Sequence, residues 1–306
     1  MSFADELGAW ATAIEGTATG RDVALALVLC AALLHAVVSA MQKGRFDPWT
    51  ARAAIDLSYG IMVAPIALFV VPPPEPEVIP VLVLALVAHS VYKTLQAMAF
   101  RRGNYTLVYP VVRGTGPLVA VVAAGFVFGE VFAPLQWTGV LLLTGGIFGL
   151  AAFNLLEIRV KRQELLLAVS LAMLTGIAVA GYTMIDAYGI RATENPFTFL
   201  AWLFFMDGFY MPAVWLIRYR QPEIARQWRA LSVFGVVGGI VAVASFGSVM
   251  LATRFDQVGE VAVLRETSTI FAAVIGRLFL RETVGAKRFL LIASIAAGAL
   301  LVEIGS

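Results

Sequence analysis

The stretch Tyr109-Pro-Val-Val-Arg-Gly-Thr-Gly-Pro117 places an arginine, two glycines and two prolines in or beside an apolar run that ends near Gly129-Glu130. A second stretch, Val261-Ala-Val-Leu-Arg-Glu-Thr-Ser268, belongs to a similar run that ends near Arg281-Glu282. The two runs align at one constant offset, without insertions or deletions. We therefore predict that the chain repeats one structural unit. Three pairs of residues are each separated by 152 positions: Arg113 and Arg265, Glu130 and Glu282, and Gly146 and Gly298.

The composition indicates a membrane protein. Of the 306 residues, 60% are hydrophobic and only 14% are charged, whereas soluble domains carry about 25% charged residues. Apolar runs long enough to cross a bilayer as helices fill nearly the whole chain. The formal charge of +2 does not favour a nucleic-acid partner, and Cys30, the only cysteine, excludes an intramolecular disulfide. Met1 to Gly20 lacks the apolar core of a cleavable signal peptide.

We therefore predict an all-α integral membrane fold of ten transmembrane helices, arranged as two five-helix repeats. A short extramembrane tail (1–21) precedes the first repeat (22–156) and the second (157–306). The connections are short, so no soluble domain is expected between spans. Small residues at 139–149 and 293–298 favour close helix packing. The expected spans are 22–42, 51–71, 78–100, 105–129, 134–156, 165–188, 196–217, 230–252, 258–280 and 284–304.

The orientation follows from lysine and arginine near the ends of the spans. Fifteen of them lie on one side of the membrane and three, namely Arg21, Arg191 and Arg254, on the other. Because the cytoplasmic side carries the excess, both termini are expected outside. Five spans per half make the halves antiparallel, and inverted repeats commonly hold the substrate at their interface.

Polar side chains recur at helical spacing inside the spans. An ionisable residue at membrane depth is a functional hypothesis by default, because burying it uncompensated is costly. We expect these faces to converge on one protein-lined cavity. The residues are His35, Ser39 and Gln42 in the first span, His89, Lys93 and Gln96 in the third, Thr175, Tyr182 and Asp186 in the sixth, and Asp207 and Tyr210 in the seventh.

Charge suggests two interpretations of this set. Lys93, Arg113 and Arg265 balance Asp186, Asp207 and Glu266, so the six could be interhelical staples or could line a binding site. Arg113 favours a binding site. We expect Pro117 to restart a helix, which would point free N–H groups and a guanidinium at an anionic group. A proline kink alone would also explain this pattern.

The remaining candidates have alternatives of their own. His35 and His89 could carry coupling protons or simply hydrogen-bond a neighbouring helix. Trp202 and Tyr210 could contact substrate or serve only in packing. Two histidines without a third ligand do not predict a metal site, and no cofactor is expected. The sequence contains no HExxH motif and no Gly-rich phosphate loop, and it indicates no Ser-His-Asp set, so we do not expect an enzyme.

Taken together, the pattern resembles the drug/metabolite transporter superfamily, EamA type. The resemblance rests on ten spans in two halves, each with a glutamate (Glu130, Glu282) after its fourth span and a Gly/Ala-rich helix following. The strings Ala32-Leu-Leu-His35, Trp202-Leu-Phe-Phe-Met-Asp-Gly208 and Leu264-Arg-Glu-Thr-Ser268 resemble one bacterial branch. The resemblance implies a central cavity and alternating access. Larger members are usually drawn with both termini in the cytosol, whereas the charge count places these termini outside.

We accordingly expect a secondary transporter of a small polar, anionic or zwitterionic metabolite in a bacterial inner membrane, with protons as a candidate coupling ion. Arg113 and Arg265 are expected to bind an anionic group, and Asp186 and Asp207 an ammonium group or a proton. The alternatives are a flippase for a lipid-linked substrate and a non-transporting membrane enzyme or scaffold. The rest of the expected site is His35, His89, Lys93, Gln96, Tyr182, Trp202, Tyr210 and Glu266.

Overall fold

A computed structural model describes residues 3–41, 46–102, 105–157, 162–219, 227–279 and 285–306, and all regular secondary structure in these ranges is helical. Short breaks divide two of the longer segments, after Asp207 and after Leu264. The elements are α1 (Phe3–Ile14), α2 (Ala18–Met41), α3 (Pro48–Phe69), α4 (Ile79–Arg102), α5 (Tyr105–Phe128), α6 (Pro134–Glu157), α7 (Arg162–Ala192), α8 (Pro196–Asp207), α9 (Tyr210–Val214), the π-helix η1 (Trp215–Tyr219), α10 (Trp228–Phe255), α11 (Val258–Leu264), the 3-10 turn η3 (Arg265–Thr267), α12 (Ser268–Phe279) and α13 (Ala286–Ile304).

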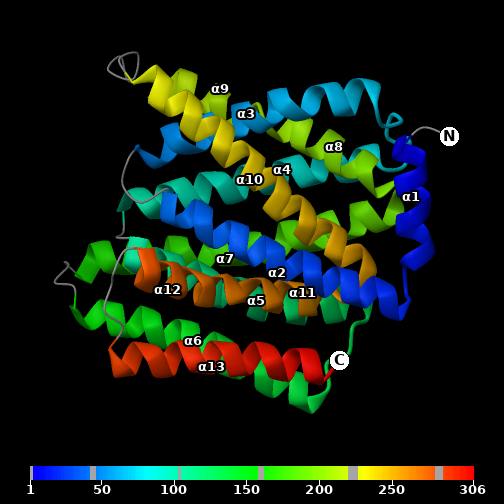
Figure 1. The fold of residues 1–306 in the computed structure, drawn as a ribbon. Coiled ribbons are helices and arrows are strands. Elements are labelled where there is room, and N and C mark those ends of the chain that lie inside the picture. The colour runs from blue at the N-terminus through cyan, green and yellow to red at the C-terminus, as the bar shows by residue number, and fades with distance from the viewer. Residues whose placement is uncertain (1–2, 42–45, 103–104, 158–161, 220–226, 280–284) are drawn as a thin grey trace.

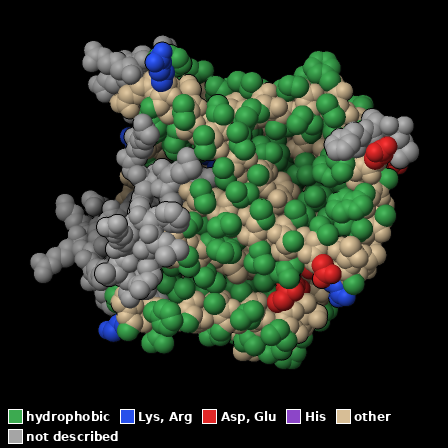
Figure 2. Space-filling model, viewed as in Figure 1, with side chains coloured by type: hydrophobic (Ala, Val, Ile, Leu, Met, Phe, Trp, Pro, Cys, Tyr) green, Lys and Arg blue, Asp and Glu red, His purple; other side chains and the backbone are tan. Residues whose placement is uncertain are grey.

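Eight helical segments among the described residues are long and apolar enough to cross a membrane. They are α2 to α7, the segment Pro196–Arg218, which includes the short break after Asp207, and α10. Hydrophobic side chains cover most of the face shown in Figure 2, and only a few charged side chains are in view. The chain is therefore a multi-pass membrane protein. The last two predicted spans correspond to the broken segment α11–η3–α12 and to α13, whose apolar part is Phe289–Ile304.

The long helices run back and forth between two ends of the molecule (Figure 1). Both termini lie at one end, and α1 crosses that end. Asn195 ties α1 to the bundle, because its side-chain amide donates to the carbonyl of Ala4 at 2.9 Å. The same side chain accepts from the N–H of Phe197 and so caps α8. A capping residue followed by proline favours a helix start, and α8 begins where the expected span 196–217 begins.

The two halves pack by exchanging their first helices. Helix α2 packs on α10 and α12 of the second half, and α7 packs on α4 and α5 of the first. The small-residue helices α6 and α13 pack on each other. A Cβ atom added to Gly139 would lie 2.6 Å from the carbonyl oxygen of Gly298, and one added to Gly298 would lie 2.6 Å from that of Gly139. Glycine thus lets the two backbones approach closely.

Helix α5 corrects one expectation. It is continuous from Tyr105 to Phe128 although it contains Pro110 and Pro117, so the predicted restart at Pro117 is wrong. Proline removes one N–H, but a transmembrane helix tolerates a single missing hydrogen bond when neighbouring groups surround it. The break occurs instead at the corresponding place in the second half, where the 3-10 turn Arg265–Thr267 separates α11 from α12.

Candidate functional site

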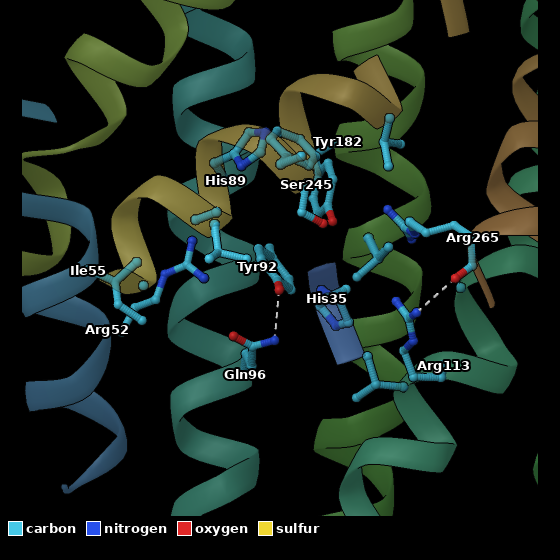
Figure 3. Close-up of a pocket in the computed structure, with 18 of the residues that line it drawn as sticks. His35, Arg52, Ile55, His89, Tyr92, Gln96, Arg113, Tyr182, Ser245 and Arg265 are labelled. Carbon is cyan, nitrogen blue, oxygen red and sulfur yellow. Dashed lines mark hydrogen bonds between the residues drawn. The ribbon is translucent and has the colours of Figure 1, made fainter. Parts of the chain in front are cut away.

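A cavity of about 160 Å³ lies between the two halves of the chain. Its walls come from α2, α3, α4, α5, α7, α8, α10 and η3. Figure 3 shows Arg113 and Arg265 on one side of this space and Arg52 on the other, with His89 and Tyr182 near one another. Its polar and charged lining is His35, Arg52, Tyr59, His89, Tyr92, Gln96, Tyr109, Arg113, Tyr182, Asp207, Ser245, Arg265 and Glu266.

The first charged group joins the two repeat stretches. Nη2 of Arg113 donates to the main-chain carbonyl of Arg265 at 3.2 Å and to the hydroxyl of Ser268. Nε of Arg113 lies 2.7 Å from Oε2 of Glu266, and Nε of Arg265 lies 3.8 Å from Oε1 of the same carboxylate. Neither contact has hydrogen-bond alignment, so both are ion pairs. One carboxylate thus faces two guanidinium groups.

The second group surrounds Lys93, whose side chain is completely buried. Its Nζ lies 2.6 Å from Oδ2 of Asp56 and 2.5 Å from Oδ2 of Asp207, and it also donates to the hydroxyl of Tyr59 at 2.8 Å. The Tyr59 hydroxyl donates to Asp207 in turn. Arg52 lies one turn before Asp56, with Nε 2.8 Å from Oδ1. Two cations and two carboxylates therefore balance, as burial requires.

The third group is a histidine–carboxylate pair. Nε2 of His89 lies 2.8 Å from Oδ2 of Asp186, and both side chains are buried. The imidazole stacks on Tyr182 with centroids 4.4 Å apart and meets the edge of Phe246 at 5.3 Å. Further along α4, in the direction of its C-terminus, Gln96 donates a hydrogen bond to the hydroxyl of Tyr92 at 2.7 Å (Figure 3).

His35 enters the cavity from α2. Its ring stacks with that of Tyr109 at 6.4 Å, and the guanidinium of Arg113 lies 5.7 Å from the same Tyr109 ring. The other two members of its predicted face, Ser39 and Gln42, have side chains outside the described part of the chain. Thr175, predicted on the face of Tyr182, instead bonds the carbonyl of Leu171 in its own helix.

The structure thus brings most of the predicted residues together. His35, His89, Gln96, Arg113, Tyr182, Asp207, Arg265 and Glu266 line the cavity, while Lys93 and Asp186 lie directly behind it and contact lining residues. Trp202 and Tyr210 do not line it. Trp202 packs against Phe205, and the hydroxyl of Tyr210 bonds that of Thr94.

The sequence reasoning missed Asp56, Tyr59 and Ser268, and it counted Arg52 only among the fifteen lysines and arginines near the ends of the spans. Asp56 carried a usable signal, since it is a carboxylate inside the expected span 51–71 and one helical turn after an arginine. Applied there, the rule that intramembrane charges need partners would have selected the pair. Tyrosine and serine are common in membrane helices, so Tyr59 and Ser268 gave no such signal.

Several buried polar atoms around the cavity have no hydrogen-bond partner in the described residues. They include Oδ1 of Asp186, Oδ1 of Asp207, both carboxylate oxygens of Glu266 and Nε of Arg265. Buried polar atoms are normally satisfied by protein or water, and of these residues Asp207, Glu266 and Arg265 line the cavity itself. The described residues contain no group of three or more His, Cys, Asp or Glu side chains that could hold a metal ion.

Comparison with known proteins identifies a similar fold and a matching family. A solved structure described only as "Crystal structure of protein" has a TM-score of 0.72 at 15% identity, covering 94% of this chain and 99% of that one. At this identity the likeness concerns the fold. A search of curated proteins finds no match. The sequence profile of the EamA-like transporter family matches twice, at residues 22–152 and 166–304, one match in each half of the bundle around the cavity. The chain therefore belongs to the EamA-like transporter family.

Proposed function

We propose that this protein is a secondary active transporter that moves a small polar, anionic or zwitterionic metabolite by alternating access. The observation that carries the proposal is the charged, partly unsatisfied cavity at the interface of the two halves, centred on Arg113 and Arg265. Inverted-repeat transporters hold their substrates at such interfaces. Members of the matched family are in general transporters rather than enzymes.

The proposed topology has ten spans, with α11–η3–α12 and α13 as the last two. Figure 1 supports it, because both termini lie at one end and the helix ends at Arg102, Arg162 and Trp228 lie at the other. The excess of lysine and arginine at that other end favours termini outside the cytoplasm of a bacterial inner membrane. The 3-10 turn Arg265–Thr267 offers a place where the second half can bend, since such turns inside helices often mark hinges.

In the proposed site, Arg265 makes the primary contact with an anionic group. Within the described part of the chain its Nε has no hydrogen bond, and its ion pair with Glu266 is long, at 3.8 Å, whereas Arg113 is held by three neighbours. Asp207, which lines the cavity, offers an acceptor to an ammonium group, whereas Asp186 lies behind the wall and can take a proton only through His89. His35, His89, Gln96 and Tyr182 complete the polar wall, with Lys93 holding Asp207 in place.

Trp202 and Tyr210 do not line the cavity, so we propose for them roles outside the central site. Tyr210 lines a second pocket of about 820 Å³ with Arg101, Arg102 and Arg218, at the basic end. We assign this pocket to the approach path of an anionic substrate, because clustered basic side chains raise the local concentration of anions. Trp202 has a buried indole N–H without a hydrogen-bond partner in the described residues, which is available if the helices rearrange.

The test is flux into proteoliposomes containing the purified full chain. A labelled panel should include singly charged anions (lactate, benzenesulfonate), dianions (succinate, phenyl phosphate), zwitterions (alanine, phenylalanine), choline and a lipid-linked sugar. We expect flux of one chemical class, which Arg113→Ala abolishes. Arg265→Gln, which breaks fewer contacts, should weaken binding about tenfold to a hundredfold, since a charged hydrogen bond is worth about 1.5–3 kcal/mol.

The matched control is Arg229→Gln, which removes an exposed guanidinium at the start of α10 and should leave flux unchanged. Folding of each variant is checked by monodispersity in detergent. Normal flux through folded Arg113→Ala and Arg265→Gln would contradict the assignment of the site. Flux of the lipid-linked sugar alone would replace this proposal with a flippase, and no flux at all would leave an enzyme or scaffold.

A further inference from the structure

The three charged groups around the cavity differ in formal charge. Arg52, Lys93, Asp56 and Asp207 sum to zero. Arg113 and Arg265 share the single carboxylate of Glu266, which leaves one positive charge.

His89 and Asp186 carry one negative charge when the imidazole is neutral. His35 is counted as neutral, because a further cation beside Arg113 would add to an existing excess. The cavity of the described residues is therefore neutral overall when His89 is neutral, but its charge is separated.

The negative part of this arrangement is the pair of His89 and Asp186. Asp186 is 2% exposed and does not line the cavity, whereas His89 does and is 4% exposed. The carboxylate therefore reaches the cavity only through the imidazole. Its second oxygen, Oδ1, has no hydrogen-bond partner among the residues that the structure describes, so the contacts seen leave the negative charge of Asp186 only partly compensated. A proton that enters from the cavity and binds His89 converts the pair into a neutral ion pair.

The positive part faces the same space. Arg265 and Arg113 line the cavity from η3 and α5, and Tyr182, which stacks on His89, lines it from α7 (Figure 3). The charged and titratable groups around His89 line the cavity or contact a residue that lines it, and they come from its own helix and from α2, α3, α5, α7, α8 and η3. They are Tyr182 and Asp186 on α7, Asp207 on α8, Arg52, Asp56 and Tyr59 on α3, Tyr92 and Lys93 on α4, Arg113 and Tyr109 on α5, Arg265 and Glu266 on η3, and His35 on α2.

We propose that His89 and Asp186 bind one coupling proton, that Arg265 with Arg113 binds a substrate carrying one negative charge, and that the two cross the membrane together without net charge. This inference rests on the proposed transport function and narrows it. The empty cavity and the cavity holding both anion and proton are neutral. The anion alone leaves a charge of −1, and the proton alone a charge of +1.

The coupling follows from the cost of enclosing charge. When a transporter closes around its site, an uncompensated charge is taken out of water, which costs several kcal/mol. The two neutral states therefore change conformation readily, and the two charged states do so rarely. Since each tenfold in population corresponds to about 1.4 kcal/mol, a penalty of this size makes uncoupled crossing rare.

The cavity walls indicate the chemical nature of the uncharged part of the substrate. Tyr92, Tyr109, Phe204 and Phe246 line the same cavity, so an apolar or aromatic group has surface to pack against. The expected class is a singly charged carboxylate, sulfonate or phosphonate monoester with an apolar portion. A zwitterion of zero net charge would leave the site at +1 together with the proton, and so would not be coupled in this way.

The first experiment needs no ligand and uses the fact that the chain has only two histidines. In protein labelled with ¹⁵N-histidine, the His35→Gln variant leaves the signals of His89 alone. Replacing Arg265 with glutamine removes the same positive charge that a bound anion neutralises. Across a pH titration we expect His89 to keep its proton to a higher pH in Arg265→Gln than in otherwise native protein, to be unchanged in Arg265→Lys, and to lose its proton at a lower pH in Asp186→Asn. An unchanged titration of His89 in Arg265→Gln would overturn the coupling.

The second experiment uses the compound that carries flux in the panel above. A pH gradient, acidic on the side of the substrate, should drive its accumulation, whereas a potassium–valinomycin potential should not. Protein-free liposomes correct for passive entry. Folded His89→Gln should lose the response to the pH gradient, whereas Arg229→Gln should keep it. Transport of a dianion or a cation, or transport driven by the potential, would contradict this inference alone. Absence of all flux would contradict the proposed function, and the histidine titration would still decide the charge coupling.

Discussion

Arg113 donates a hydrogen bond at 3.2 Å to the main-chain carbonyl of Arg265, the residue that occupies the same position in the other half of the chain. The two repeat stretches therefore meet at the centre of the molecule. They are not equivalent there. Arg113 lies in a continuous helix and is followed by Gly114, whereas Arg265 begins a 3-10 turn and is followed by Glu266. One half supplies a rigid arginine, and the other supplies a bend, an arginine and the carboxylate that both share.

Glu266 is predicted to be essential for the stability of this centre. Glu266→Gln leaves Arg113 and Arg265 buried without a counter-charge, and breaking one partner of a buried ion pair costs about 3–5 kcal/mol. The thermal midpoint in detergent should fall clearly, and the double variant Arg113→Gln/Glu266→Gln should recover at least half of the loss. Glu77→Gln, at an exposed position, is the control. A midpoint equal to that of the native protein would show that solvent already compensates Arg113.

Lys93 is also predicted to be essential for stability, here because its ammonium group lies between two carboxylates. Lys93→Met leaves Asp56 and Asp207 close together without the cation that bridges them, at a cost of about 3–5 kcal/mol. Adding Asp207→Asn should restore folding, because Asp56 keeps Arg52 at 2.8 Å. The measurement is the yield and thermal midpoint of monodisperse protein. If the double variant is less stable than Lys93→Met, the balance of charge is not what Lys93 contributes.

The contact of α6 with α13 predicts opposite effects of alanine at two glycines. A Cβ atom at Gly298 would lie 2.6 Å from the carbonyl oxygen of Gly139 and 2.6 Å from the backbone nitrogen of Leu143, whereas one at Gly145 would have nothing within 4 Å. Overpacking costs about 1–3 kcal/mol, so Gly298→Ala should lower the thermal midpoint. Gly145→Ala should hold or raise it, because alanine favours the helix by about 0.5–1 kcal/mol. Equal effects at both positions would contradict the packing.

Glu130 is predicted to fasten the start of α11 to the first half. Its Oε1 accepts from the N–H of Val258 at 2.6 Å and its Oε2 from that of Gly259 at 2.9 Å. Since such a cap contributes about 1 kcal/mol, Glu130→Ala should speed hydrogen exchange of these two amides roughly fivefold to tenfold. The amide of Val261, bonded to Gln257 within its own half, should change less. Uniform exchange along α11 in the variant would argue against a local cap.

Much of this arrangement could be predicted because periodicity and charge are local properties of a sequence. The separation between Arg113 and Arg265 predicted a repeat, and the family matches at 22–152 and 166–304 confirm two copies. The spacing of His89, Lys93 and Gln96 predicted one polar helical face, and all three lie at or behind the cavity wall. Membrane depth makes such positions conspicuous, since few reasons exist to bury a charge in hydrocarbon.

The rest depended on how helices rotate and bend against each other. Trp202 and Tyr210 share α8 and α9 with Asp207 but face away from the cavity, and no single helix pattern gives that rotation. Pro117 was expected to interrupt α5, yet the interruption lies at Arg265–Thr267, where no proline occurs. Tertiary contacts decide which of two related stretches deforms. The pairing of Lys93 with Asp56 likewise depends on the approach of α3 to α4.

The most direct test of the central claim, that the cavity between the halves is the substrate site, is a thermal-shift measurement of purified protein with the flux panel. A ligand that binds the folded state raises its midpoint by mass action. We predict that singly charged anions raise the midpoint of the native protein and of Arg229→Gln, and that folded Arg265→Gln needs about tenfold to a hundredfold more ligand for the same shift. Equal shifts in the native protein and in folded Arg265→Gln would contradict the claim, because the bound compound would then occupy another part of the molecule.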